Sequence, residues 1–368
     1  MKKFFIIAAA AIVALAACTK SEINTPAQKE ISYNAVTAKN TVSKAIINTT
    51  YYAPTYPAFG IWGLYQSTDW STNHAAASSN IWVGNSSTGA SAQITNTTRT
   101  DAGYWKNATT DYWPLAGTLV FMGYSPYANV SSKAGISVTD TDKVTLTVTN
   151  FSSHTGSWVD DLMYSDPVER TENDTKYQPD GTTNKYDGVP VVFHHALSQI
   201  AVYAKQHEAY TGYTIKVTKI ELVIDDKATL TAKAAPGSDA VATWSTPVTD
   251  EETATILDNA SNADLTTSYV QQGSAILVIP QALDADDTNG YDKLLVTYSM
   301  THNGITSTLT TPKTVNLRVA STLESLAPNT KYNLKLDISL DEILYSPDVA
   351  DWESTEVNQE YAVPQPTV

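Results

Sequence analysis

The sequence has little cysteine and little charge, and both shortages limit what the protein can be. Among 368 residues there is one cysteine, so neither a disulfide framework nor a cysteine-based zinc finger can form. Charged residues make up 17% of the chain, and 38 Asp and Glu outnumber 23 Lys and Arg, which gives a formal net charge of -15. Because an acidic chain repels phosphate backbones, we expect no nucleic-acid partner.

Long apolar runs and familiar catalytic motifs are also missing. After residue 18 no stretch approaches ~18 consecutive apolar residues, so no later segment is expected to cross a membrane as a helix. The sequence contains no G-x-S-x-G, no P-loop and no G-x-G-x-x-G motif. Since no acid, base and nucleophile set is apparent, we expect no enzyme, no catalytic residues and no cofactor.

The N-terminus reads as an export signal. Lys2 and Lys3 precede an apolar run over residues 4–14, which is too short to span a bilayer. The following Leu15-Ala16-Ala17-Cys18 resembles the bacterial lipobox, and it contains the only cysteine of the chain. We therefore expect a lipoprotein signal peptide over residues 1–17, lipidation of Cys18 and a polar tether over residues 18–29. An ordinary signal peptide with a chance cysteine is the alternative.

What remains has the composition of a β-protein. Hydrophobic residues make up 42%, which is typical of a globular chain, and low charge with many Thr, Val and Tyr favours strands. Residues 144–149 alternate strictly, with Val144, Leu146 and Val148 on one face, and residues 334–340 show the same period. Both segments are predicted as antiparallel strands with one wet face.

Other segments carry more local predictions. Alternation in residues 213–224 slips between Val217 and Ile220, which indicates a β-bulge or a strand covered on both faces. Residues 275–279 predict a buried strand that stops at Pro280, and Asn289-Gly290 before residues 294–298 predicts a hairpin. Residues 196–204 could hold one or two helical turns at most.

Together these patterns predict an all-β protein with two antiparallel β-sandwiches in tandem. Residues 171–188 are polar and rich in turn-forming residues, which marks them as a linker. We therefore expect an N-terminal sandwich over residues 30–190 and a C-terminal sandwich over residues 191–368.

No metal site is predicted. His194 and His195 are neighbours, and neighbours on a strand point to opposite faces, so we expect packed histidines rather than joint metal ligands. The aspartates of residues 284–292 miss the EF-hand pattern, because Asn289 and Leu295 stand where it needs Gly and Glu. A solvated loop is expected there.

Several segments, in order along the chain, resemble the fimbrillin family, the subunits of type V pili on Gram-negative outer membranes. The resemblance is carried by residues 58–62 (AFGIW), 112–126 (YWPLAGTLVFMGYSP), 160–164 (DDLMY), 191–202 (VVFHHALSQIAV), 278–281 (VIPQ) and a closing strand that ends at Trp352. Each segment also has a plain structural interpretation, since Trp113, Phe121, Leu162 and Phe193 would be core residues in any sandwich.

The resemblance implies transthyretin-like sandwiches and a mode of assembly. In this family a protease removes the N-terminal strand of a lipoprotein precursor at the cell surface, and a strand of another subunit fills the exposed groove. By this comparison the removable strand lies in residues 30–36, with Ile31, Tyr33 and Ala35 facing inward. The candidate donor strand is the tail 356–363, in which Val357, Gln359, Tyr361 and Val363 alternate. An ordinary last strand is the alternative for that tail.

The candidate release site departs from the family pattern. Family cleavage often follows an arginine, whereas this chain has Lys44-Ala45 in the matching segment and its first arginine is Arg99. Either cleavage occurs after Lys44, or the subunit keeps its strand and lipid as an anchor or terminal component.

The sequence therefore predicts a fimbrial subunit that serves cell adhesion at the outer membrane. Its expected partners are other pilin subunits in a homo- or hetero-polymer, the outer membrane through palmitate and other acyl chains on Cys18, and host or bacterial surface ligands. The alternative is a lipid-anchored surface glycan-binding protein that uses Trp and Tyr side chains as stacking platforms.

Overall fold

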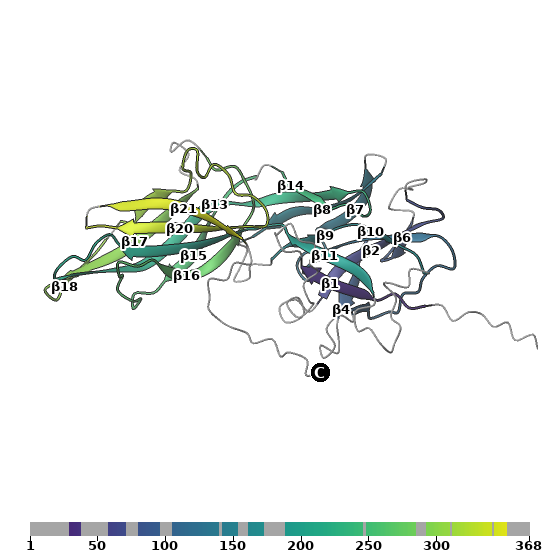
Figure 1. Ribbon diagram of the computed structural model, residues 1–368, viewed down its shortest axis with the longest axis horizontal. Helices are drawn as coiled ribbons and strands as arrows, with labels where there is room; N and C mark the ends of the chain where they lie inside the picture. The colour runs from purple at the N-terminus through teal and green to yellow at the C-terminus, as the bar shows by residue number, and fades with distance from the viewer. Residues whose placement is uncertain are drawn as a thin grey trace, which may run out of the picture.

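The computed structural model describes residues 29–37, 58–70, 80–95, 105–139, 142–153, 161–172, 188–245, 248–284, 292–309, 311–340 and 342–351. Every regular element in these ranges is a strand, and the strands form two lobes placed end to end (Figure 1). The prediction of an all-β protein is confirmed. Over the same ranges, no helix is long and apolar enough to span a membrane.

A nine-stranded sheet builds most of the first lobe. Its order is β1 (Tyr33–Thr37), β11 (Val189–His195), β9 (Met163–Ser165), β6 (Thr118–Ser125), β2 (Ala58–Gln66), β4 (Ala92–Thr95) and β5 (Lys106–Asn107), with β10 (Val168–Arg170) on β6 and β3 (Ile81–Val83) on β2. The central strands β2 and β6 are buried on both faces, which explains why their sequences are nearly continuous apolar runs.

An eight-stranded sheet is shared by the two lobes. It comprises β18 (Ile305–Thr308), β17 (Lys293–His302), β13 (Tyr213–Ala234), β8 (Lys143–Ser152) and β7 (Ala134–Thr139), with β14 (Val241–Trp244) and β15 (Val248–Asp258) on β13 and β19 (Lys313–Asn316) on β17. The first half of β13 pairs with β17 and β15, whereas its second half pairs with β8 and β14. A single long strand therefore runs through both lobes.

A four-stranded sheet completes the second lobe. Its order is β16 (Val270–Val278), β12 (Ser198–Gln206), β20 (Thr330–Ile338) and β21 (Ile343–Asp351). Strands β12 and β20 run parallel, as do β1 and β11, and the other strand pairs of the described residues are antiparallel. Parallel neighbours need long connections, and both of these pairs join segments more than a hundred residues apart.

Three apolar clusters form the core. One fills the second lobe between the four-stranded sheet and the first half of β13, and includes Ile200, Leu222 and Leu334. A second lies between the nine-stranded sheet and strands β7, β8 and β13, and includes Trp62 and Leu230. A third lies on the other face of the nine-stranded sheet and includes residues of β1, β2, β6 and β11.

Several local predictions are confirmed. Val144, Leu146 and Val148 lie buried on β8, and the predicted slip in residues 213–224 is a register shift between Val217 and Lys219 on β13. The strand before Pro280 ends at Val278, as expected. All four expected core residues, Trp113, Phe121, Leu162 and Phe193, are buried.

Two local predictions are wrong. Residues 196–204 lie mainly in strand β12, whose central place in a sheet buries Ala201 on one face and Ile200 and Val202 on the other, so that its apolar residues mimic a helical pattern. The hairpin at Asn289-Gly290 does not form either, because β16 pairs with β12 and β17 pairs with β13 in a different sheet. The chain crosses between sheets there, and Asn289 and Gly290 themselves lie outside the described residues.

The predicted boundary near residue 190 divides the chain into two segments that are expected to fold independently. Independent folding is not visible in a single structure, so the boundary stays a prediction. Ala228, Leu230 and Ala232 of β13 pack in the same cluster as Trp62 and Leu64 of β2. Packing of the first lobe therefore draws on residues on both sides of position 190.

Candidate functional site

Residues 29–37 join the two ends of the nine-stranded sheet. On one side β1 pairs in parallel with β11, from Tyr33 opposite Val189 to Thr37 opposite Phe193. On the other side the Tyr33 amide donates to the Trp105 carbonyl (2.8 Å), and the Trp105 amide donates to the Tyr33 carbonyl (3.2 Å). Because Trp105 directly precedes β5, the last strand of the sheet order, the N-terminal segment closes the sheet upon itself.

The inward side chains of this segment are buried completely. Ile31 is 2% exposed, and Tyr33 and Ala35 are 0% exposed. The Tyr33 ring meets Phe121 and Phe59 edge-on, with centroid distances of 5.7 and 6.2 Å, and Phe59 packs on Trp105 at 5.4 Å. We call the space bounded by Phe59, Trp105 and Phe121 the Tyr33 pocket. Without residues 29–37, this pocket would be the floor of an open apolar groove beside β11.

The Tyr33 hydroxyl is a poorly satisfied polar group in the buried strand. It has no hydrogen-bond partner, and burial, followed by the nearby Asp111 carboxylate, raises the pKa of Tyr33 well above its ordinary value of 10.0. Burial also raises the pKa of Asp111, and the Asn107 amide that donates to it (3.0 Å) opposes the shift. A buried hydroxyl without a partner is destabilising by about 1–3 kcal/mol. The apolar part of the Tyr33 side chain therefore matches the groove, whereas its hydroxyl does not.

Gly188 lets β11 approach β1 closely. A Cβ atom on Gly188 would lie 2.9 Å from the Tyr33 carbonyl carbon and 3.1 Å from that of Ser32. The adjacent Val189 amide donates to the Ser32 carbonyl at 2.8 Å. A larger residue at position 188 would therefore push any strand out of this groove at its entry.

The structure brings together one of the predicted sets of site residues. Ile31, Tyr33 and Ala35 share one buried face, as their alternation predicted. Cys18, Lys44 and Ala45 lie outside the described residues, as do Val357, Gln359, Tyr361 and Val363 of the candidate donor strand, so their roles stay predictions. Sequence reasoning did not identify Trp105, Asp111 or Gly188 as neighbours of β1. Of these three residues, only Gly188 lies in a segment that the sequence analysis had marked, the polar and turn-rich segment 171–188.

The two adjacent histidines lie on the groove wall and face opposite ways. His194 Nε2 lies 2.8 Å from Asp166 Oδ2, and His195 Nδ1 lies 2.8 Å from Asp161 Oδ2. The second oxygen of Asp166 accepts from the Ala240 amide at 2.7 Å. These contacts hold β11 against its neighbours and give each histidine a packing role. Within the described ranges, no group of three or more His, Cys, Asp or Glu side chains is placed to hold a metal ion.

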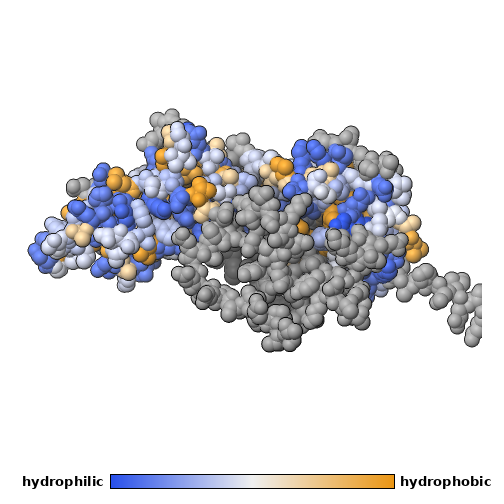
Figure 2. All heavy atoms as spheres, in the orientation of Figure 1, coloured by the Kyte–Doolittle hydropathy of each residue, from blue (hydrophilic) through white to orange (hydrophobic). Residues whose placement is uncertain are grey.

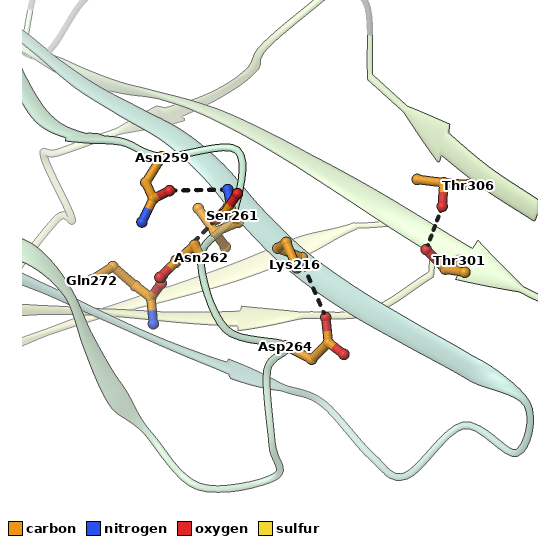
Figure 3. Close-up of polar contacts among 9 residues, drawn as sticks. Lys216, Asn259, Ser261, Asn262, Asp264, Gln272, Thr301 and Thr306 are labelled. Carbon is orange, nitrogen blue, oxygen red and sulfur yellow. Dashed lines mark hydrogen bonds and ion pairs between the residues drawn. The ribbon is translucent and has the colours of Figure 1, made fainter. Parts of the chain in front are cut away.

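A polar loop in the second lobe is held to the neighbouring strands by hydrogen bonds and an ion pair (Figure 3). Residues 259–269 connect β15 to β16, and Asn262 Nδ2 donates both to Gln272 Oε1 (2.8 Å) and to the Val217 carbonyl (3.0 Å). Lys216 pairs with Asp264 at 3.7 Å. The Leu265 amide donates to the Ile215 carbonyl, so the loop covers an edge of β13 that pairs with no strand of the described residues. We therefore assign the loop a structural role, which is to cover this edge of β13.

One buried carboxyl in the second lobe is electrostatically strained. Asp292 is 4% exposed, and burial raises its pKa from 3.8 to about 6, with Asp225 and Asp284 adding to the shift. The Asp284 amide donates to Asp292 Oδ2 at 2.6 Å, which opposes the shift without cancelling it. This group responds to mildly acidic pH, although it lies in the other lobe from the groove.

Exposed aromatic side chains gather near one rim of the first lobe. Trp82 is 43% exposed and Tyr112 is 41% exposed, and the Trp82 indole donates to the Tyr112 carbonyl at 2.7 Å. The Tyr65 ring lies 5.6 Å from Trp82, tilted by 35°. On the face shown in Figure 2, strongly hydrophobic residues occur in small groups among hydrophilic ones. Tyr65, Trp82 and Tyr112 form what we call the rim aromatics.

The sequence matches the family model described as fimbrillin-like over residues 57–352. The match covers most of the chain, so the protein belongs to the fimbrillin-like family, and the resemblance seen in the motifs is confirmed. The family is one of structural, non-enzymatic proteins of the pilus type, in agreement with the expectation that the chain is not an enzyme.

Solved structures that match this chain come from species of Bacteroides and Porphyromonas, among others. A protein of Bacteroides uniformis described as a cell adhesion protein is 19% identical with a TM-score of 0.45, over 88% of this chain and 99% of that one. A fimbrial protein of Bacteroides vulgatus is 19% identical with a TM-score of 0.47, over 87% and 99%. The tip fimbrial protein Mfa3 of Porphyromonas gingivalis is 10% identical with a TM-score of 0.38, over 88% and 100%. A comparison with curated proteins finds no match. Because these likenesses are distant, family membership follows from the match over residues 57–352.

Proposed function

We propose that the protein is a subunit of an outer-membrane fimbria that assembles by strand addition and serves cell adhesion. The precursor is exported through the periplasm as a lipoprotein with its lipid on Cys18, and loss of the segment that carries β1 opens the groove to a strand of another subunit. One observation carries this proposal. A short N-terminal strand buries Ile31, Tyr33 and Ala35 completely, yet it is a separate segment that a single cut in the following residues would detach from the fold.

Strand addition at this groove would support a persistent polymer. A strand of about eight residues buries roughly 400–500 Å² of apolar surface, which contributes on the order of 10 kcal/mol before the cost of ordering it. Main-chain pairing with β11 on one side and with Trp105 on the other adds to this attraction. A fibre held in this way needs no disulfide, in keeping with the single cysteine.

Cleavage after Lys44 is the proposed release step, and residues 356–363 of a neighbouring subunit are the proposed donor. Both segments lie outside the described residues, so the support is their sequence. Lys44-Ala45 follows β1 by a few residues, and Val357, Gln359, Tyr361 and Val363 alternate as an inserted strand requires. A subunit that is never cut would keep its lipid and serve as an anchor or terminal component.

The test is controlled proteolysis of the full-length protein. Trypsin-like treatment of the parent should give SDS-resistant ladders, and the double variant Lys39→Ala with Lys44→Ala should abolish them, because it removes both Lys residues between β1 and β2. Lys20→Ala is the matched control, because a cut before β1 does not detach this strand, so the ladders should stay intact. Deletion of residues 356–368 should also prevent ladders. The proposal fails if the cleaved parent stays monomeric at every concentration and the deletion changes nothing.

A glycan-binding role is the second candidate, and the rim aromatics favour it. Aromatic faces that are half exposed and held in place by a hydrogen bond suit stacking against a sugar ring. The measurement is retention of the uncut monomer on immobilised polysaccharides, compared with Trp82→Ala. Unchanged retention in this variant would remove the candidate.

A further inference from the structure

Strand β7 forms a free sheet edge that carries no device against pairing with another chain. It is the last strand of the eight-stranded sheet and lies beside β8 in the first lobe (Figure 1). Its outer edge pairs with no strand of the described residues. Its sequence, AGISVT, contains no charged residue and no proline. An edge strand of this kind is a template for strand addition, and proteins usually blunt such edges.

The other edge strands of the described residues are blunted in ways that β7 is not. Strands β3, β5, β10, β14, β18 and β19 have four residues or fewer. Among the longer ones, β21 contains Pro347, β15 contains three consecutive acidic residues (250–252), and β16 is irregular at Gly273, which has a φ of 69°. Strand β7 therefore stands apart as an edge that is open to pairing.

The backbone of β7 directs unpaired groups outward at alternate residues. The Thr149 amide donates to the Lys133 carbonyl at 3.0 Å, so in the observed register the odd-numbered residues of β7 hydrogen-bond to β8. Because hydrogen-bonded and non-hydrogen-bonded pairs alternate in an antiparallel ladder, the N–H and C=O groups of Ile136 and Val138 point away from β8. The Ala134 amide, by contrast, already donates to a carbonyl of the preceding turn at 3.0 Å.

The side chains of β7 leave the core of the first lobe partly open at this edge. Ala134, Ile136 and Val138 pack against the cluster between the nine-stranded sheet and strands β7, β8 and β13, yet each is only partly buried. On the opposite face, a Cβ atom on Gly135 would meet no atom within 4 Å. A further strand beside β7 would therefore extend the apolar layer on one face and meet no obstruction at Gly135 on the other.

A second copy of β7 fits this edge in an antiparallel register centred on Ile136. To keep the apolar residues on the core side, even-numbered residues must lie opposite even-numbered ones. Pairing Ile136 with Ile136 of the second copy does this, and it places Ala134 opposite Val138. The contact is twofold and self-complementary, so it uses the free edge of both copies. The lack of charge in β7 favours this site, because two copies with a net charge of -15 each repel one another elsewhere.

We propose that two copies of the protein associate laterally by antiparallel pairing of their β7 strands. This contact involves neither β1 nor its groove, so it goes beyond the proposed function and is independent of strand exchange. Six paired residues from each copy bury less than the ~1,200–2,000 Å² of a stable interface, so isolated copies associate weakly. Along a fibre many such contacts act together, and their avidity holds neighbouring fibres side by side.

The experiment uses the uncut full-length protein with Cys18→Ser, so that no disulfide can join two copies. In the double variant Gly135→Lys with Ser137→Lys, like charges lie directly opposite each other across the proposed interface, which disfavours pairing. Gly135→Glu with Ser137→Glu is the complementary variant, because a mixture of the two places opposite charges there. The matched control is Ile305→Lys with Ser307→Lys, which adds the same charge to exposed residues of β18 at the other end of the same sheet.

Sedimentation velocity of the Cys18→Ser protein should show a weight-average mass that rises at least ~1.3-fold between ~10 µM and ~1 mM, as expected for a weak contact. Each double variant of β7 alone should stay monomeric, their equimolar mixture should associate at least as strongly as the Cys18→Ser protein, and the β18 control should behave like that protein. General repulsion would not explain a loss in the lysine variant, because its two added lysines reduce the net charge from -15 to -13.

Three results would overturn the proposal. The first is a Cys18→Ser protein that stays monomeric at ~1 mM, where a weak contact should be populated. The second is association of the lysine variant of β7 equal to that of the β18 control, which would place the contact elsewhere. The third is a mixture of the lysine and glutamate variants that stays monomeric, since rescue requires that the two strands lie side by side in the proposed register.

Discussion

Tyr33 is the residue on which retention of the N-terminal strand depends most, and two substitutions there should act in opposite directions. Truncation to alanine removes a fully buried ring from contact with Phe59 and Phe121, a loss of about 3–5 kcal/mol. Substitution with phenylalanine keeps the ring and removes the hydroxyl that has no partner, which should stabilise the strand by about 1 kcal/mol. Since ~1.4 kcal/mol is a factor of ten, Tyr33→Ala should weaken retention by a factor of ~100 or more, and Tyr33→Phe should strengthen it by a factor of ~5.

The assay is dissociation of the cleaved N-terminal segment from the rest of the protein. Full-length parent and variants are cut once after Lys44, the complexes are isolated, and release of the segment is followed by size-exclusion chromatography and mass spectrometry. Glu30→Ala is the matched control, because Glu30 is an exposed residue of the same segment and its truncation should change release little. Faster release from Tyr33→Phe than from the parent would refute the claim that the hydroxyl is unsatisfied. Equal release from Tyr33→Ala would refute the anchoring role of the ring.

Three further predictions test other parts of the structure. Gly188→Val should prevent both retention of β1 and formation of ladders, because a Cβ at this position meets the backbone of Ser32 and Tyr33; normal ladders would contradict this. The pKa of Asp292 is raised to about 6 in the folded protein, so its stabilising effect is complete below pH ~4 and lost as the pH rises through 6. At pH 7.5, Asp292→Asn should raise the melting midpoint, because it removes up to ~3 kcal/mol of destabilisation. The variant should also flatten the dependence of stability on pH between pH 4 and 6; an unchanged pH profile by calorimetry would refute this prediction. A fragment of residues 18–190 should show no cooperative unfolding by circular dichroism, because it lacks Leu230 and Ala232 of the shared core; a sharp transition would support a boundary near 190.

Strands with one wet face were predictable from the sequence. On β20 the buried residues alternate with partly exposed ones, and on β8 the buried Val144, Leu146 and Val148 lie two residues apart, so a period of two is visible in the sequence itself. The bulge in β13 was predictable for the same reason, because a register shift moves the apolar phase from one face to the other.

Sheet membership was not predictable from the same patterns. On strand β12 Ala201 is buried on the face opposite Ile200 and Val202, so this apolar run does not separate a strand from a short helix. Asn289-Gly290 is a good turn sequence, but a dipeptide cannot show that the strands before and after it belong to different sheets. Pairing is a long-range property, and local chemistry constrains it weakly.

The candidate site was predictable only in part. The alternation of Ile31, Tyr33 and Ala35 identified the inner face of the strand, which the structure buries. The Tyr33 pocket was not foreseen, since Phe59, Trp105 and Phe121 come from three separate segments and meet only when the sheet curves around β1. The unsatisfied hydroxyl and the close approach of Gly188 depend on that same curvature.

The arrangement of β11 explains why the groove always needs an occupant. Val189, Val191 and Phe193 are buried partly by the residues of β1, and an empty groove would expose them together with the free backbone edge of β11. Strand β11 continues after two residues into β12, the centre of the four-stranded sheet, so a loosened β11 would disturb the second lobe as well. In the structure β1 covers these residues, and under the proposed function a strand of a neighbour would cover them after cleavage. Under the proposed function, assembly is an exchange of one occupant of this groove for another, and its direction would depend on how well each strand fills the Tyr33 pocket.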